Sequence, residues 1–322
     1  MRKFYALLRK LTGNGVVDFN SKQERDNWVS SGSGDRRSID AETAYKFYRM
    51  ENKPTNNAKL LRKFATRVSG GILSKGEYLL NGKKVLVKGN TKGNVEPYAE
   101  YITSNLCKGL LYNLENVPQI VEYLLADSKE YPEVKVHDFD KVSVCEMYNL
   151  HTLQFYNWVR LREAGVGVSS PREYVKNNCT AEAKRDISIM ILLDALTGNI
   201  DRHFNNWDMV VDTEGVAPLL DFGGSLLSNY KNEWRNYKKP TSEIAPDVSK
   251  PFKSTHLDQI RLIGFFMEGK VLEINNPKLI SDYVFKQAVG VDPKYLTAAK
   301  NYFDSRCRSI LAILEKEVKV RV

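Results

Sequence analysis

The hydrophobic pattern changes from alternating to helical along the chain. Between residues 66 and 148, short runs of alternating apolar and polar positions predict strands, and Asn81-Gly82 predicts a tight hairpin turn between two of them. Further along, the apolar positions recur at helical spacing. The run from Ile187 to Leu196 is apolar almost all round, which predicts a core helix. This order predicts an α+β fold in which a β-rich part precedes a mostly helical part.

These patterns divide the sequence into three segments. Residues 1–64 are expected to form an accessory helical region, because Asp40 fits a helix N-cap and the stretch from Ala58 to Phe64 begins a further helical segment. Residues 65–148 hold the predicted strands and one helix, and residues 149–322 hold the remaining helices. A chain of 322 residues is long enough to bury a substantial core.

Composition is typical of a soluble globular protein, with 42% hydrophobic and 27% charged residues. The four cysteines are scattered without a C-x-x-C pair, which argues against a thiolate metal site and indicates a reducing compartment. No stretch is as long as a membrane-spanning helix, and the apolar run at the N-terminus is too short for a signal peptide. We therefore expect a cytoplasmic protein without a transmembrane segment.

The net charge of +9 suits an acidic ligand or partner, such as a nucleotide. Lysine and arginine are spread through the chain without the regular aromatic interleaving of a groove that binds single strands. Direct nucleic-acid binding is therefore not expected.

The strongest chemical signal lies between residues 198 and 226. Asp201 and Asp221 bracket Asn206, and the sequence between Asn206 and Asp221 predicts a hairpin. Phosphoryl transfer uses this set: one carboxylate accepts or orients the proton of the acceptor hydroxyl, while a second carboxylate and an amide oxygen bind Mg²⁺ at the nucleotide phosphates. We assign the first role to Asp201, as catalytic residue, and the second to Asp221 and Asn206, as metal ligands.

Each part of this motif also has a structural explanation. The letters D-F-G occur by chance in many chains, and Asp201 with Arg202 fits an exposed ion pair on a surface loop. The combination D-x-x-x-x-N, hairpin and D-F-G is far more specific, and it predicts a kinase site between two lobes. His203 is expected to anchor the loop through hydrogen bonds and to be neither a base nor a metal ligand.

Residues upstream are candidates for contacts with ATP. The stretch Ser69-Gly70-Gly71 allows backbone N–H groups to approach phosphates. Lys88 ends a predicted strand; a lysine there is either solvated or, given the motif downstream, within reach of the α- and β-phosphates. Glu100, in the helix predicted next, is our candidate for the carboxylate that pairs with Lys88.

The candidate site for the purine ring is Glu146-Met147-Tyr148. These residues end the last predicted strand, just before the helical pattern begins. A hinge between lobes presents backbone donors and acceptors at that point. The assignments together imply ATP and Mg²⁺ as cofactors.

From roughly residue 65 to residue 315, the chain resembles the C-terminal kinase region of HipA-like serine/threonine kinases, the toxin components of toxin–antitoxin systems. The letters D-R-H-F-N-N and P-L-L-D-F-G carry the resemblance, since they match that family's D-x-H-x-x-N and P-x-x-D. The resemblance implies a two-lobed protein-kinase-like fold. It makes Asp201 the catalytic base, Asn206 and Asp221 the Mg²⁺ ligands and Lys88 the lysine at the phosphates.

The resemblance also implies a protein substrate phosphorylated on serine or threonine; aminoacyl-tRNA synthetases are among the substrates of this family, and other translation factors are candidates. An antitoxin protein is a candidate partner. Autophosphorylation near the phosphate loop has Ser69, Thr66 and Ser74 as candidate sites, although the family's S-G-x-Q-x-K reads S-G-G-I-L-S-K here. Two alternatives stay open: a lipid or small-molecule kinase on the same fold, and a pseudokinase-like module that binds ATP.

Overall fold

The computed structural model describes much of the chain from Lys59 onward. The described residues are 59–64, 73–147, 155–156, 171–203, 206–207, 209–210, 215–228, 233–237, 248–250, 252–268, 271–317 and 320–321. Several sequence-based assignments lie outside them, namely the predicted loop Ser69-Gly70-Gly71, the candidate phosphorylation site Thr66, the hinge residue Tyr148 and the accessory region up to residue 58.

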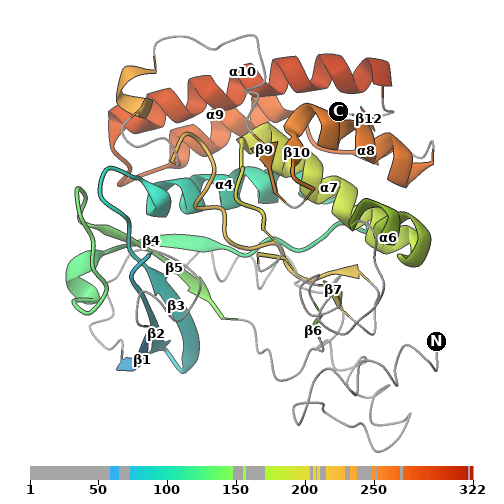
Figure 1. Cartoon of the computed structure of the whole chain (residues 1–322). Coiled ribbons are helices and arrows are strands. Elements are labelled where there is room, and N and C mark those ends of the chain that lie inside the picture. Colours follow the sequence, from blue (N-terminus) through green and yellow to red (C-terminus); the bar gives the residue numbers. More distant parts are fainter. Residues whose placement is uncertain are drawn as a thin grey trace, which may run out of the picture.

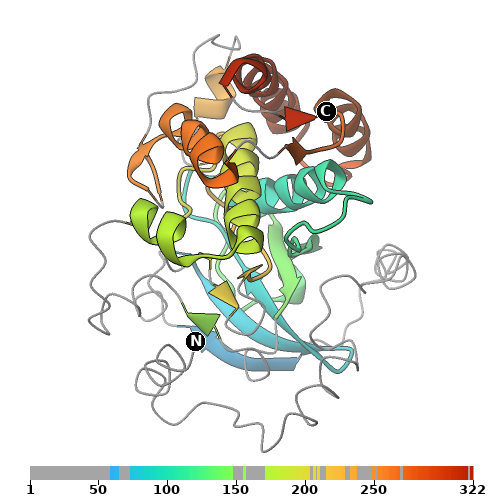
Figure 2. The ribbon, with the colours of Figure 1, turned by 90° about the vertical axis from the view of Figure 1, so that its right-hand side faces the viewer.

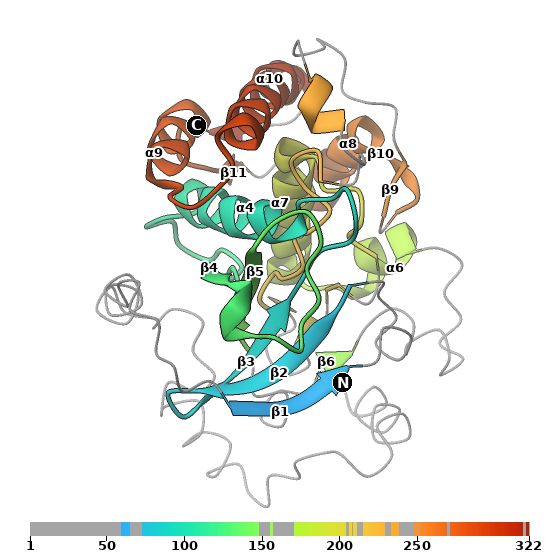
Figure 3. The ribbon, with the colours of Figure 1, turned by 90° about the vertical axis from the view of Figure 1, so that its left-hand side faces the viewer.

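The described residues form two parts, a β-sheet with one helix and a group of helices (Figure 1). Helix α4 (Glu96–Leu110) lies between the sheet and the C-terminal helices α9 (Pro277–Gln287) and α10 (Pro293–Glu317) in Figures 1 and 3. This arrangement confirms the predicted α+β fold, with the β-rich part first and the helical part second.

The sheet has five strands in the order β1-β2-β3-β5-β4, and all neighbouring strands are antiparallel. The strands are β1 (Lys59–Phe64), β2 (Lys75–Leu80), β3 (Lys83–Lys88), β4 (Tyr123–Asp127) and β5 (Lys141–Glu146). Asn81 and Gly82 join β2 to β3 with φ angles of 51° and 78°, which is the backbone of a tight hairpin turn and confirms that prediction. Val85 and Val87 alternate into the core, as the pattern of β3 indicated.

The first strand corrects one prediction. The stretch from Ala58 to Phe64 was expected to begin a helix of an accessory region, but Lys59–Phe64 is strand β1 and pairs with β2. The letters K-L-L-R-K-F fit either structure locally. The free edge of β2 presents N–H and C=O groups that only a neighbouring strand can pair along its length, and this pairing outweighs local helical preference. The sheet therefore starts before residue 65.

Helix α4 covers one side of the sheet and is itself covered by the C-terminal helices (Figure 3). It is the helix in which the sequence analysis placed Glu100. Ile102, Leu106 and Leu110 are fully buried along one face, while Pro97 occupies the first turn, where a missing N–H does no harm. Its position brings Glu100 beneath the sheet.

Among the described residues, the helical part contains five further helices, short strands and one 3₁₀ turn, while a second 3₁₀ turn follows β4 in the sheet part. The helices are α6 (Pro171–Asn178), α7 (Ala181–Thr197), α8 (His256–Met267), α9 (Pro277–Gln287) and α10 (Pro293–Glu317). The short strands are β6 (Phe155–Tyr156), β7 (Met209–Val210), β8 (Gly215–Val216), β9 (Val248–Ser249), β10 (Ser254–Thr255), β11 (Leu272–Glu273) and β12 (Val320–Arg321), and the 3₁₀ turns are η1 (Ser128–Glu130) and η2 (Glu233–Asn236). None of the helices in the described ranges has the length and apolar character that crossing a membrane requires.

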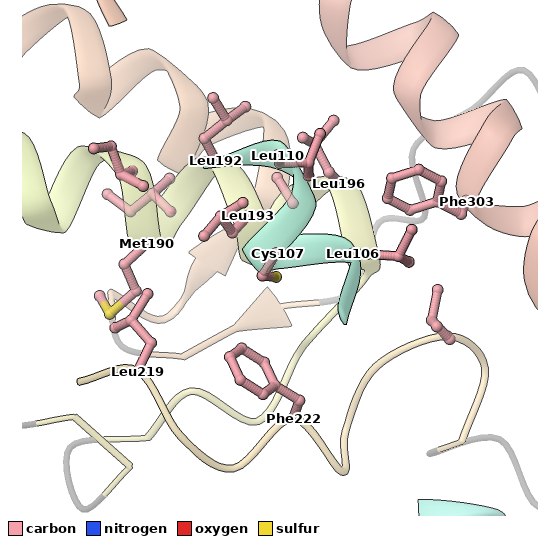
Figure 4. Close-up of a cluster of buried hydrophobic side chains, with 14 of the residues drawn as sticks. Leu106, Cys107, Leu110, Met190, Leu192, Leu193, Leu196, Leu219, Phe222 and Phe303 are labelled. Atoms are coloured by element: carbon pink, nitrogen blue, oxygen red, sulfur yellow. The ribbon is translucent and has the colours of Figure 1, made fainter. Parts of the chain in front are cut away.

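Helix α7 is the central helix of this part: it packs against α8 and α10, and α4 lies beside it in Figure 2. Every residue from Asp186 to Thr197 is buried, as the apolar run predicted. Leu192, Leu193 and Leu196 point into the cluster drawn in Figure 4, beside residues of α4. The helix begins at Thr180, whose side chain accepts a hydrogen bond from the N–H of Ala183. It thus provides a rigid base for the loop that follows it.

Candidate functional site

Lys88 is buried at the end of β3 and forms an ion pair with Glu100 of α4. The distance from Lys88 Nζ to Glu100 Oε1 is 2.5 Å, and both side chains are at most 2% exposed. The second carboxylate oxygen of Glu100 accepts a hydrogen bond from the hydroxyl of Ser143 in β5. The pairing predicted between Lys88 and Glu100 is present, and three elements of the sheet part hold it in place.

Asp221 approaches the same lysine from the helical part. Its Oδ1 lies 3.1 Å from Lys88 Nζ, and its N–H donates to the Tyr123 hydroxyl at 3.0 Å. Its φ of 60° lies in the left-handed region, which is uncommon for residues other than glycine. Burial would raise the pKa of the Asp221 carboxyl, but Lys88 and then Lys75 lower it to about 2. Asp221 therefore stays ionised, as a metal ligand requires.

Lys88 also remains charged. Burial would lower its pKa, but Asp221 and Glu100 raise it well above the ordinary lysine value. The fixed charge is the form that binds phosphate groups.

The loop after α7 positions Asp201 and Asn206. Gly198 ends the helix with a φ of 69°, and its N–H donates to the carbonyl of Asp194. The carbonyl of Asp201 accepts hydrogen bonds from the N–H of His203 at 2.7 Å and from Nδ2 of Asn206 at 2.9 Å. The side chain of Asp201 is 47% exposed, so an acceptor can reach it.

Arg202 is the positioning residue that sequence reasoning missed. Its guanidinium is fully buried and pairs with both carboxylate oxygens of Asp194, each at 2.9 Å. It also donates to the carbonyls of Asn206 and Leu220, and it lies over the ring of Phe222 at 5.1 Å. One side chain thereby fixes the backbone at Asn206 and immediately before Asp221.

This geometry replaces the exposed Asp201–Arg202 pair that was one explanation of the motif. Asp201 pairs with Lys250, at 2.8 Å between Nζ and Oδ1, and Arg202 pairs with Asp194. The signal for the second pair was Asp194 itself, because a lone carboxylate in an apolar helix needs a buried partner. No comparable signal marked Lys250.

Lys75 is another basic residue of the site that the sequence did not single out as one. It begins β2 and is the register partner of Lys88. Burial lowers its pKa, and the charge of Lys88 lowers it further, although Asp221 and Glu100 act in the opposite direction. Two lysines, Lys75 and Lys88, therefore lie at the end of the sheet that faces Asp221.

The remaining predicted residues are placed at the edge of this arrangement. Glu146 ends β5 and forms an exposed ion pair with Lys83 at 2.9 Å. The N–H of Met147 donates to the carbonyl of Lys84, so this donor is committed to β3. The Ser74 hydroxyl is buried and accepts the N–H of Lys135 at 2.9 Å, a bond that phosphorylation there would break.

The donors present fit a Mg²⁺ ion bound together with nucleotide phosphates. Mg²⁺ in such sites takes one or two protein ligands and completes its shell with phosphate oxygens and water. Asp221 supplies an ionised carboxylate, and Asn206, whose Nδ2 is engaged with Asp201, has its amide oxygen to offer. Within the described ranges, no cluster of three or more His, Cys, Asp or Glu side chains forms a site that would hold a metal without such a nucleotide.

Comparison with known proteins identifies the fold. No protein-family model matches the sequence, and no curated protein matches it. Among solved structures, the proinflammatory kinase CtkA of Helicobacter pylori matches with a TM-score of 0.53 and 15% identity, over 76% of this chain and 91% of CtkA. The chain has a kinase-like fold. A thermostable mutant of aminoglycoside phosphotransferase APH(4)-Ia matches with a TM-score of 0.25 and 10% identity, over 79% of this chain and 94% of that protein. A score this low does not establish a shared fold.

The kinase-like fold accounts for the two parts of the molecule, which correspond to the two lobes predicted from the sequence. The first lobe supplies Lys88 and Glu100, and the second supplies Asp201, Asn206 and Asp221. The contact between Lys88 and Asp221 is where the two sets meet. At 15% identity, the likeness to CtkA establishes the fold only.

Proposed function

We propose that this chain is an ATP-dependent protein kinase that transfers the γ-phosphoryl group to serine or threonine. The observation that carries the proposal is the buried Lys88 between Glu100 and Asp221, at 2.5 and 3.1 Å. A fully buried lysine between two carboxylates is a costly arrangement for stability alone. Kinases use this combination to hold nucleotide phosphates and their metal ion.

Each residue of the constellation has a role that follows from its environment. Lys88, oriented by Glu100, contacts the phosphates as a fixed charge. Asp221 and Asn206 would hold Mg²⁺, which would neutralise charge on the phosphate oxygens. Asp201 is half exposed, so it receives the acceptor hydroxyl and takes its proton during transfer.

The proposed acceptor is a protein, and the resemblance of the D-R-H-F-N-N and P-L-L-D-F-G segments to HipA-like kinases supports this choice. On the same basis we propose a role as a toxin or growth regulator. The candidate substrates are then an aminoacyl-tRNA synthetase or another translation factor, and the candidate regulator is an antitoxin protein. Autophosphorylation at Ser69 or Thr66 belongs to this proposal; at Ser74 it would require opening of the bond with Lys135.

The test is transfer from γ-labelled ATP with Mg²⁺, using the purified chain alone and with cell lysate. Asp201→Asn should lower the rate of transfer about 10²–10⁴-fold, because it removes the group that takes the proton. Asp140→Asn, a matched change of an exposed aspartate outside the site, should leave the rate unchanged. Chelation of Mg²⁺ with EDTA should abolish transfer.

Mass spectrometry of the labelled products then identifies the acceptor class. Label on serine or threonine that disappears in Asp201→Asn is the expected result. Label only on lipids or small molecules would instead indicate a different kinase on the same fold. ATP binding without any transfer, in the chain alone and with lysate, would refute the enzymatic proposal in favour of a binding module.

A further inference from the structure

Lys250 lies beside the proposed base although it is far from it in sequence. Its Nζ is 2.8 Å from Oδ1 of Asp201, and the two side chains are 50% and 47% exposed. Lys250 directly follows β9, and its backbone forms a parallel bridge with that of Asp201. The ammonium group is therefore at the open side of the site, where an acceptor must enter.

The backbone at Lys250 is anchored at several points, unlike that of an ordinary surface lysine. Its N–H donates to the carbonyl of Ile200 at 3.3 Å, and the hydroxyl of Ser249 donates to the carbonyl of Asn199 at 3.2 Å. The buried side chain of Gln259 on α8 donates to the carbonyl of Ser249 at 2.7 Å. The loop after α7 and helix α8 thus hold the backbone of this lysine at the base.

The loop that carries the base contributes no exposed lysine or arginine of its own. Between residues 198 and 206, Arg202 is the one lysine or arginine, and it is buried against Asp194. Lys88 is engaged on the opposite side by Glu100 and Asp221. Lys75 of β2 interacts with Asp201 through its charge, but Lys250 is the lysine in direct contact with the carboxylate of the base. A phosphoryl group moving towards an acceptor at Asp201 therefore approaches the ammonium group of Lys250.

We propose that Lys250 is a further catalytic residue, whose ammonium group binds the phosphoryl group while it passes from ATP to the acceptor held at Asp201. The inference rests on the proposed function. In the step, the bond from the acceptor oxygen to phosphorus forms, the bond from phosphorus to the leaving oxygen of ADP breaks, and the acceptor proton goes to Asp201. Lys250 keeps its proton and forms no covalent bond.

This assignment also explains why Lys250 and Asp201 form an ion pair before the phosphoryl group is transferred. While Asp201 is ionised, it holds the ammonium of Lys250 in place. When Asp201 takes the acceptor proton, its attraction for Lys250 falls, and the phosphoryl oxygens become the stronger partner. The contact with phosphate therefore strengthens during transfer, which is the condition for lowering the barrier.

The experiment compares Lys250→Met with Lys253→Met. The second variant removes the same charge from an exposed lysine at the turn between β9 and β10, so it controls for net charge and for the hairpin. In each variant, the rate of phosphoryl transfer from γ-labelled ATP to protein or water is measured. The affinity for fluorescent ADP is measured with and without aluminium fluoride, which mimics the phosphoryl group in transfer.

Lys250→Met should lower the transfer rate about 10²–10³-fold, as removal of one donor to a transition state does. Its affinity for ADP alone should stay within about 3-fold of the original, since the residue contacts only the transferred group. The gain in affinity from aluminium fluoride should be lost, and Lys250→Arg should restore part of it. Lys253→Met should behave like the unmodified protein in all assays.

Two results would overturn the inference while leaving the proposed kinase function intact. One is an active enzyme in which Lys250→Met and Lys253→Met have equal rates and equal responses to aluminium fluoride. The other is a faster Lys250→Met, which would make the contact with Asp201 an inhibitory one. If the unmodified protein transfers no phosphoryl group to protein or water and Asp221→Asn binds ADP–aluminium fluoride as the original does, the proposed function fails and the inference fails with it.

Discussion

Replacement of Arg202 by methionine should destabilise the fold more than most single substitutions. The guanidinium is fully buried and makes two hydrogen bonds to Asp194 and one each to the carbonyls of Asn206 and Leu220. Methionine fills similar space without these donors. It leaves the Asp194 carboxylate, 5% exposed, with Asn199 Nδ2 at 2.9 Å as its remaining side-chain donor among the described residues.

The magnitude follows from the loss of one partner of a buried ion pair, which costs about 3–5 kcal/mol. Domains are stable by about 5–15 kcal/mol, so this loss is a large fraction of the total. At about 2–4 °C per kcal/mol for chains of this order of size, Tm should fall by about 6–20 °C. Arg202→Lys should cost less, because it keeps the charge, but a lysine cannot reproduce the bidentate contact.

The assay is urea unfolding of Arg202→Met, Asp194→Leu and the double variant. The double variant replaces the whole pair by apolar side chains, so its loss should be smaller than the sum of the single losses, with a coupling energy of about 2–3 kcal/mol. Lys278→Met, which breaks the exposed pair with Asp282, is the control and should cost less than about 1 kcal/mol. A loss below about 1 kcal/mol in Arg202→Met, or additive losses in the double variant, would refute the reasoning.

Two further predictions concern backbone strain and a buried histidine. Gly198→Ala should lower the free energy of unfolding in urea by about 2–5 kcal/mol, because φ is 69° there and an added Cβ would clash with the Tyr302 hydroxyl. Gly82→Ala should lower it by only about 1–2 kcal/mol, because φ is 78° but nothing lies within 4 Å of the added Cβ. Equal losses in the two variants would contradict this explanation. Burial and then Arg306 lower the pKa of His256 to about 3, so the unfolded chain takes up the proton first and stability is lost as pH falls from about 6.5 towards 3. The free energy of unfolding should therefore be about 1.4 kcal/mol lower at pH 5.5 than at pH 7.5, from RT ln(1 + 10^(6.5 − 5.5)). Urea unfolding of the original protein and of His256→Gln at the two pH values measures this difference, and the contribution of His256 should be absent from the variant.

The sequence predicted the elements whose pattern is local. The apolar run of α7 needs no partner to be recognised, because a helix that is hydrophobic on every side must be buried. Asn81-Gly82 likewise determines a hairpin by its own backbone preferences. Asp201, Asn206 and Asp221 were selected as candidates by their spacing along the chain, and the structure brings Asn206 to Asp201 and Asp221 to Lys88.

The contacts that hold these residues could not be predicted in the same way. Arg202 and Asp194 lie on opposite sides of the turn at Gly198, and only the folded loop brings the guanidinium back onto the helix. Lys250 lies 49 residues after Asp201, at a distance along the chain that no local pattern spans. Strand β1 depends on the free edge of β2, a feature that exists only once the sheet has formed.

The bonds of Lys88 limit how the site can bind a nucleotide. An ammonium group has three N–H donors, and the three are engaged with Glu100, Asp221 and Tyr123 at 2.5, 3.1 and 3.4 Å. Contact with a phosphate therefore requires Lys88 to release one of these partners. If Asp221 binds Mg²⁺ as proposed, its carboxylate would turn towards the ion and away from Lys88. Lys88 would then be free for phosphate, so on the proposed function metal and nucleotide should each raise the affinity for the other.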